Sequence, residues 1–160
     1  ISNAIQVCKN NGNMLAFIVL ERGSGFYYRL DLFERFEWPF LQRYVDAFVS
    51  EGIIPWLHLD TDWSLNLPYL RQLPKGKCVC DLDSMTDIFK AKEILGDYMC
   101  IMGDVPASML FLKEPEDIYA YCTGLIRQLG PQGFILQSGC DIPANAKLEN
   151  VQAMVAAAVG

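Results

Sequence analysis

Short apolar runs alternate along the chain with longer segments that have the period of a helix. The apolar runs are rich in branched and aromatic side chains, and they cover residues 14–20, 53–59, 77–82, 98–103 and 133–138. This pattern predicts five strands. Because the runs are apolar throughout rather than in alternation, it is typical of strands covered on both faces, as in a parallel sheet.

Helices are predicted between these strands. In the longest segment, apolar residues recur at three- and four-residue spacing and predict one buried stripe, made of Phe40, Leu41, Tyr44, Val45, Phe48 and Val49. Pro39 cannot lie inside a helix, so we expect a short helix ending near Glu37 and a second helix with Pro39 in its first turn. Gly52 is expected to end that helix.

Further helices are predicted over residues 84–96, 114–130 and 147–159, and a short irregular one near Pro68. Ser84 or Thr86 is expected to cap the first of these, and Asp83 is a third candidate for that role. Gly96 and Gly130 are expected to close the helices that they follow.

The order of these elements corresponds to five consecutive βα units, which predicts an α/β fold with a parallel sheet. Two architectures remain open, an open doubly wound sheet and part of a (β/α)8 TIM barrel. A full barrel needs about 250 residues. The 160 residues, taken as a single domain over residues 1–160, therefore supply about five-eighths of one.

The composition of the chain excludes several classes of function. The net charge is −6 and the basic residues are scattered, so no basic stripe for nucleic acid is present. No apolar run approaches the roughly 20 residues of a membrane helix, and we expect no membrane partner. Most of the six cysteines fall inside apolar runs, and no signal peptide is visible. These features predict a reducing, cytoplasmic location.

Polar residues gather where the predicted strands end, and in both architectures chemistry collects at the carboxyl ends of parallel strands. These residues are Glu21, Arg22, His58, Asp60, Asp62, Asp81, Asp83, Asp104, Ser138, Cys140 and Asp141. All but Arg22 have side chains that can bind a metal or exchange a proton. Among them we predict Glu21 and Asp104 as catalytic carboxyl groups.

His58 is the only histidine of the chain, and it is two residues from Asp60 on one strand. The two side chains therefore point to the same face. Cys140 joins them if the sheet curves back, as a barrel does. Nitrogen, carboxylate and thiolate are all zinc ligands, and three of them leave a fourth position open for chemistry. The alternative is that His58 is a hydrogen-bonded structural residue.

Other features favour structural roles. Cys78 and Cys80 share a strand face without a second cysteine pair, which favours core packing. The turn "GSG" lacks the spacing of a dinucleotide-binding loop. We predict no residue that binds an organic cofactor directly. Burial is also the expected place of most of the aromatic residues.

Several stretches resemble the C-terminal half of the uroporphyrinogen decarboxylase family. They are "LPKGKCVCDLDSMTDIFKAKEILGDYMCIMGDVP", "GDVPASMLFLKEPEDIYAYC", "GFILQSGCDIP" and "NAKLENVQAMV". The resemblance extends from about Phe17 to Val159, and it is strongest to the branch of zinc- and corrinoid-dependent methyltransferases. It implies that the chain is the larger part of a (β/α)8 barrel, without the N-terminal units.

The resemblance also implies a ligand set. In the thiol-directed enzymes of this branch, zinc is held by a His-x-Cys pair and by the cysteine of an S-G-C motif. "HLD" and "SGC" place His58 and Cys140 at matching positions, and Asp60 stands where the pair has cysteine. A carboxylate is a harder ligand than a thiolate. It would make zinc the stronger Lewis acid and suit a methyl ether or alcohol as the small-molecule methyl donor.

The function implied by the resemblance is therefore transfer of a methyl group between such a donor and a corrinoid (cobalamin) cofactor carried by a partner protein. One alternative is a catalytically incomplete half-barrel that serves as a binding or assembly module. It would form a homo-oligomer through its exposed sheet edges. Another is a uroporphyrinogen decarboxylase-like lyase, but the family's substrate-anchoring Arg and Asp residues lie in the N-terminal part that has no counterpart in the chain.

Overall fold

The computed structural model describes residues 1–160 and contains one parallel sheet of five strands. Its strands are β1 (Leu15–Val19), β2 (Ile54–Leu59), β3 (Val79–Leu82), β4 (Cys100–Val105) and β5 (Phe134–Ser138). They lie in the sheet in chain order, and every neighbouring pair is parallel. A doubly wound sheet reverses its strand order at a switch point. The uniform order therefore confirms the α/β fold of a partial TIM barrel.

Helices connect the strands. They are α1 (Ser2–Asn10), α2 (Leu30–Leu32), a π-helical turn η1 (Phe33–Glu37), α3 (Trp38–Ser50), α4 (Leu67–Leu70), α5 (Ile88–Leu95), α6 (Met109–Leu112), α7 (Pro115–Leu129) and α8 (Leu148–Val159). The expected break before Pro39 is the change from η1 to α3. The apolar pattern did not predict α1 or α6. In α1, which has no fully buried residue, Ile5 and Cys8 pack on a small cluster beside β1 and α3.

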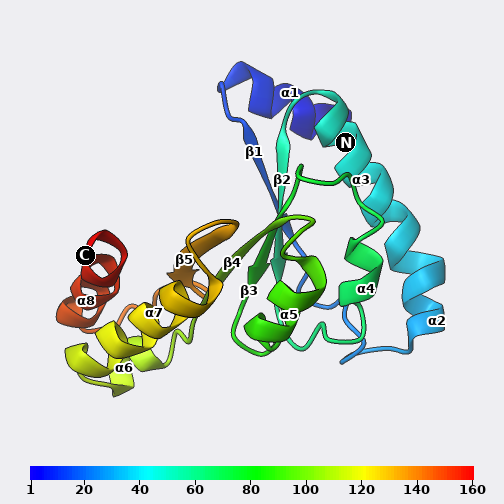
Figure 1. Ribbon diagram of the computed structural model, residues 1–160. Coiled ribbons are helices and arrows are strands. Elements are labelled where there is room, and N and C mark those ends of the chain that lie inside the picture. The colour runs from blue at the N-terminus through cyan, green and yellow to red at the C-terminus, as the bar shows by residue number, and fades with distance from the viewer.

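The main core lies between the sheet and its helices. Leu57, Leu59, Cys80, Leu82 and Ile101 point from β2, β3 and β4 into this layer and have no exposed surface. In Figure 1, α3, α4 and α5 flank β2 and β3, whereas α6, α7 and α8 lie beyond, around the β5 edge. The helix-covered face of the sheet therefore supplies the rigid support for the ends of the strands. None of the helices has the combined length and apolar character needed to cross a bilayer.

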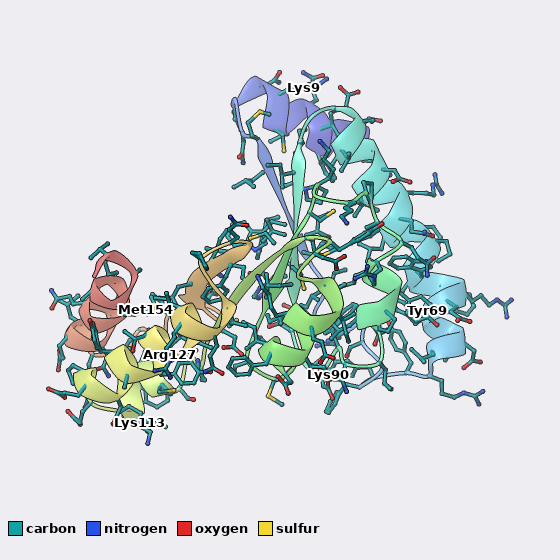
Figure 2. The ribbon with its side chains drawn as sticks, in the orientation of Figure 1. Lys9, Tyr69, Lys90, Lys113, Arg127 and Met154 are labelled. Carbon is teal, nitrogen blue, oxygen red and sulfur yellow. The ribbon has the colours of Figure 1, made fainter.

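An aromatic cluster anchors the first crossover to the second. Phe33 and Trp38 lie 5.2 Å and 5.7 Å, by ring centroids, from Tyr69 of α4. Figure 2 labels Tyr69, where α4 faces η1 and the start of α3. Trp63 completes the cluster and, like Phe33, is fully buried. The cluster fixes the segment that leaves β2, and that segment begins with Asp60.

The other face of the sheet is less covered, which differs from the expectation of strands buried on both faces. Leu15, Phe17, Val19, Ile54 and Ile135 point to this open face, and each is more than two-fifths exposed. In a closed barrel the opposite strands cover such residues. Five strands do not close a ring of eight, so the open face and the edge strands β1 and β5 remain accessible.

The cap of α5 was predicted wrongly. The helix begins at Ile88, and its N-cap is Asp87, whose carboxylate accepts hydrogen bonds from the backbone N–H groups of Phe89 and Lys90. Ser84 has a left-handed backbone with φ of 81°, so it cannot be the cap. Thr86 and Asp83 hold the loop that follows β2 instead. Asp83, Ser84 and Thr86 therefore lie in the β3–α5 loop, and α5 begins about one helical turn later than predicted.

Replacing Asp87 with alanine should lower the free energy of unfolding by about 1 kcal/mol, because two N–H groups of α5 lose their acceptor. Urea unfolding followed by circular dichroism measures this change. Ser84→Ala is the control, since the Ser84 side chain makes no hydrogen bond at the helix start, and it should have a much smaller effect. Equal effects of the two substitutions would contradict the assignment of the cap.

Candidate metal centre

A small depression lies at the carboxyl ends of β1, β2 and β5. Its volume is about 140 Å³, and it is lined by Phe17, Val19, Glu21, His58, Asp60, Cys140 and Asp141. Two residues of β1 supply its apolar lining, and the other residues supply an imidazole, three carboxylates and a thiol. Larger depressions exist elsewhere, but the largest lies at the opposite, amino-terminal end of the strands and lacks histidine.

His58, Asp60 and Cys140 meet in this depression. One potential ligand atom from each lies within 4.8 Å of the others. The Nε2 atom of His58 is 3.5 Å from Oδ1 of Asp60. His58 is 7% exposed, whereas Cys140 is exposed and carries a free thiol. The structure thus brings Cys140 to within reach of His58 and Asp60, which precede it by 82 and 80 positions, in an arrangement that one metal ion can bridge.

The imidazole of His58 is held from behind by Asp81 of β3. The Nδ1 atom of His58 lies 2.8 Å from Oδ2 of Asp81, which also accepts a hydrogen bond from the indole N–H of Trp56. This hydrogen bond to Asp81 raises the pKa of His58 to about 9, against the opposite effect of burial, and Cys140 and Asp60 add to the rise. In the absence of metal both ring nitrogens of His58 therefore carry a hydrogen near neutral pH. A metal ion that binds the ring has to displace one of these hydrogens.

The loop after Asp60 is fixed by hydrogen bonds on every side. Thr61 has a left-handed backbone with φ of 70°, which is strained for a β-branched residue. Its N–H donates to Asp83 at 2.7 Å, and its carbonyl accepts from the hydroxyl of Thr86 at 3.0 Å. Its own hydroxyl pairs with Ser24 of the "GSG" turn at 2.8 Å. These bonds hold the strained turn, and the turn sets the direction of the Asp60 side chain.

The S-G-C segment has a physical reason for each residue. The hydroxyl of Ser138 donates to the carbonyl of Cys140 at 2.8 Å. A Cβ atom on Gly139 would lie 2.8 Å from the backbone carbonyl carbon and oxygen of Asp83. Only glycine lets the two loops approach this closely. Ser138 and Gly139 therefore place the Cys140 thiol against the end of β2.

The two predicted catalytic carboxyl groups lie in different places. Glu21 lines the depression together with the three potential ligands. Asp104 is buried and accepts a hydrogen bond from the hydroxyl of Tyr121, in α7, at 3.1 Å. Burial raises the pKa of Asp104 to about 6. Asp104 thus faces the helix layer and is not part of the lining, whereas Glu21 is.

Sequence reasoning placed Asp81 at a strand end, among the groups that can bind a metal or exchange a proton, but did not predict it as a partner of His58, and it missed Trp56 and Gln137 as partners of Asp81. The amide of Gln137 lies 3.3 Å and 3.4 Å from the two carboxylate oxygens of Asp81. The sequence did contain a signal that Asp81 has side-chain partners, because a charged residue inside an apolar strand is almost never fully buried without them. The two-residue period also places Trp56 and His58 on one face.

The arrangement defines a class, that of barrel-type α/β proteins with their chemistry at the carboxyl rim of a parallel sheet. Comparison with protein families is more specific. The model of the family described as Uroporphyrinogen decarboxylase (URO-D) matches residues 16–159, so the chain belongs to that family. This result confirms the resemblance inferred from the sequence. No curated protein sequence matches the chain.

Solved structures share the fold. One of them is a methyltransferase from Methanosarcina mazei, which is 21% identical in sequence and superposes with a TM-score of 0.78. The match covers 96% of this chain and 44% of that methyltransferase. The chain therefore spans less than half of the length of that protein, and the part in common is the five-stranded region described above.

Replacing Gly139 with alanine should destabilise the protein by about 1–3 kcal/mol, because the added methyl group overlaps the backbone of Asp83. The measurement is the midpoint of urea unfolding. Gly124→Ala is the matched control. Gly124 lies inside α7 with open space around its Cα, so this substitution should stabilise by about 0.5–1 kcal/mol. A neutral Gly139→Ala would show that the two loops do not meet as described.

The raised pKa of Asp104 makes a prediction about pH. Ionising the Asp104 carboxyl group costs more free energy in the folded protein than in the unfolded chain. Asp104 should therefore lower the free energy of unfolding progressively as the pH rises from about 4 to about 6. Asp104→Asn keeps the acceptor for Tyr121 and removes the charge. Its stability relative to the parent protein should therefore increase over that range and then level off. Urea unfolding at a series of pH values gives the difference, and a flat profile would contradict the shift.

Proposed function

We propose that this chain is the metal-bearing part of a zinc-dependent methyltransferase. It would move a methyl group between a small methyl donor, such as a methyl ether or alcohol, and a corrinoid cofactor on a partner protein. The observation that carries the proposal is the convergence of His58, Asp60 and Cys140 within 4.8 Å. Membership of the URO-D family and the fold shared with a methyltransferase support it.

The donor set fits zinc. Imidazole nitrogen, carboxylate oxygen and thiolate sulfur are all zinc ligands, and three protein ligands with one free position is the pattern of catalytic sites. The two anionic ligands, Asp60 and Cys140, balance the charge of a divalent ion. Because Nδ1 of His58 faces Asp81, the ring would bind through Nε2, the atom that faces Asp60. When bound, zinc would supply Lewis-acid activation of an oxygen or sulfur atom.

The remaining lining residues have roles in this proposal. Phe17 and Val19 form the apolar wall on which a methyl group can rest. When a methyl group leaves an ether or alcohol oxygen, that oxygen needs a proton. We assign this transfer to Glu21, the carboxyl group at the β1 side of the depression. Asp104, which lies toward α7, is assigned to support of the fold rather than to proton transfer.

A second candidate function is favoured by the open face of the sheet. Apolar residues of β1, β2 and β5 are exposed there, and both edge strands have unpaired backbone groups. Exposed patches and edges of this kind promote association. The chain would then act as an assembly module and bind either further βα units or a second copy of itself, without needing a metal ion.

Zinc binding separates the two candidates. The parent protein, after dialysis against zinc and removal of the excess, should contain about one zinc ion per chain by mass spectrometry. Cys140→Ser should lower zinc affinity by more than about tenfold, because it removes a residue that binds the metal rather than one that only contacts a ligand. The far-ultraviolet circular dichroism spectrum should not change, since Cys140 is exposed and packs little core.

Cys8→Ser is the control, because Cys8 lies on α1, outside the depression. It should keep the zinc content of the parent protein. Equal zinc content in the parent protein and in Cys140→Ser would overturn the metal site. A parent protein without zinc would favour the assembly module.

A further inference from the structure

We propose that Asp81 is a positioning residue for the metal centre, a role that rests on the zinc site proposed above. Asp81 would fix the ring of His58 in one tautomer and orientation. It would also hold the end of β5, and with it Cys140, at the correct distance from β2. Its carboxylate contacts His58 of β2 directly and contacts β5 through the amide of Gln137.

The first part of the role follows from the contacts to β2. Oδ2 of Asp81 lies 2.8 Å from Nδ1 of His58 and 2.8 Å from Nε1 of Trp56. The carboxylate can only accept, so Nδ1 of His58 must carry the hydrogen when this bond is formed. Displacement of the hydrogen on Nε2 by a metal ion would then leave the lone pair of that atom facing the depression. Metal-binding histidines commonly donate their other ring N–H to a carboxylate, which fixes the ring and increases its basicity.

The second part follows from Gln137. This residue lies on β5, and its amide reaches Asp81 on β3 across the intervening β4. Cys140 follows the end of β5 by two residues. The Gln137 amide therefore links β5, the strand that leads to the Cys140 thiol, to the Asp81 carboxylate, which lies behind the His58 ring. The tie sets the distance between the two parts of the site.

Burial supports a specific role for the charge. Asp81 has no exposed surface, and no lysine or arginine pairs with it. An ionised carboxylate in such a place is costly unless every lone pair has a donor. Trp56, His58 and Gln137 supply these donors, and all of them are side chains of the open face. A purely structural polar group at this position would not need a charge, whereas a group that supports a cation-binding imidazole gains from one.

Zinc affinity, measured by competition with a chromophoric chelator, tests the proposal in variants that keep all three ligands. Asp81→Asn retains an acceptor for His58 and removes the charge. Asp81→Ala removes the acceptor as well, and Gln137→Leu removes only the tie to β5. Asp97→Asn is the matched control, because Asp97 is an exposed carboxylate paired with Arg71 away from the site. All variants are compared by circular dichroism and thermal melting, so that a change in folding is detected separately.

We expect affinity to fall about 10–100-fold in Asp81→Ala, the range typical of lost outer partners, and less in Asp81→Asn. Gln137→Leu should show a measurable fall, and Asp97→Asn should match the parent protein. If Asp81→Ala does not fold, Asp81→Asn and Gln137→Leu decide the outcome. Parent-like affinity in every folded variant would overturn the role of Asp81 and leave the zinc site in place. A parent protein that binds no zinc would overturn both proposals.

A spectroscopic measurement separates positioning from a general structural role. His58 is the only histidine, so labelling histidine with ¹⁵N gives signals from one ring. In the zinc-loaded parent protein, Nδ1 should carry the hydrogen and Nε2 should show the shift of a metal-bound nitrogen. In Asp81→Ala, the ring should show both binding modes or fast exchange between tautomers. A spectrum unchanged by Asp81→Ala would contradict the proposal.

Discussion

A fully buried carboxylate in the middle of a sheet has to be satisfied by donors, and the site is organised around that requirement. Asp81 lies on β3, the central strand, so its partners come from both directions, from β2 and from β5. The side chains that meet this need are also the ones that orient the imidazole and link it to the strand leading to the thiol. One electrostatic constraint therefore connects residues that the topology alone would only bring near one another.

Much of the fold followed from simple patterns. Five apolar runs separated by helical segments predicted parallel strands, and the carboxyl-end rule then predicted one rim for His58, Asp60 and Cys140. The structure places these three together, although their role as ligands remains a proposal. The same rule put Asp104 at the rim, and Asp104 does lie near the carboxyl end of β4, but outside the lining of the depression. Strand-end position does not say which way a side chain turns, and Asp104 turns to Tyr121 of α7.

The remaining features depend on contacts between distant loops, which no local pattern contains. Thr61 is strained by itself and is stable only because Asp83, Thr86 and Ser24 bind it from other segments. The same contacts explain why Ser84, Thr86 and Asp83 do not cap α5. The side chains of Asp83 and Thr86 bind the loop that follows β2, and Ser84 has a left-handed backbone. Propensity identifies a possible cap, but tertiary partners decide which residue becomes one.

The loop that contains Asp83 has a consequence for how substitutions combine. Its carboxylate holds the N–H of Thr61, beside Asp60, and its backbone is the surface on which Gly139, beside Cys140, rests. The two parts of the rim thus share one wall, although they are far apart in sequence. Changes at positions 61 and 139 should not be energetically independent, because each moves the same segment. Evolution or engineering at this rim would have to alter the two loops together, with the β3–α5 loop as the element through which each adjusts to the other.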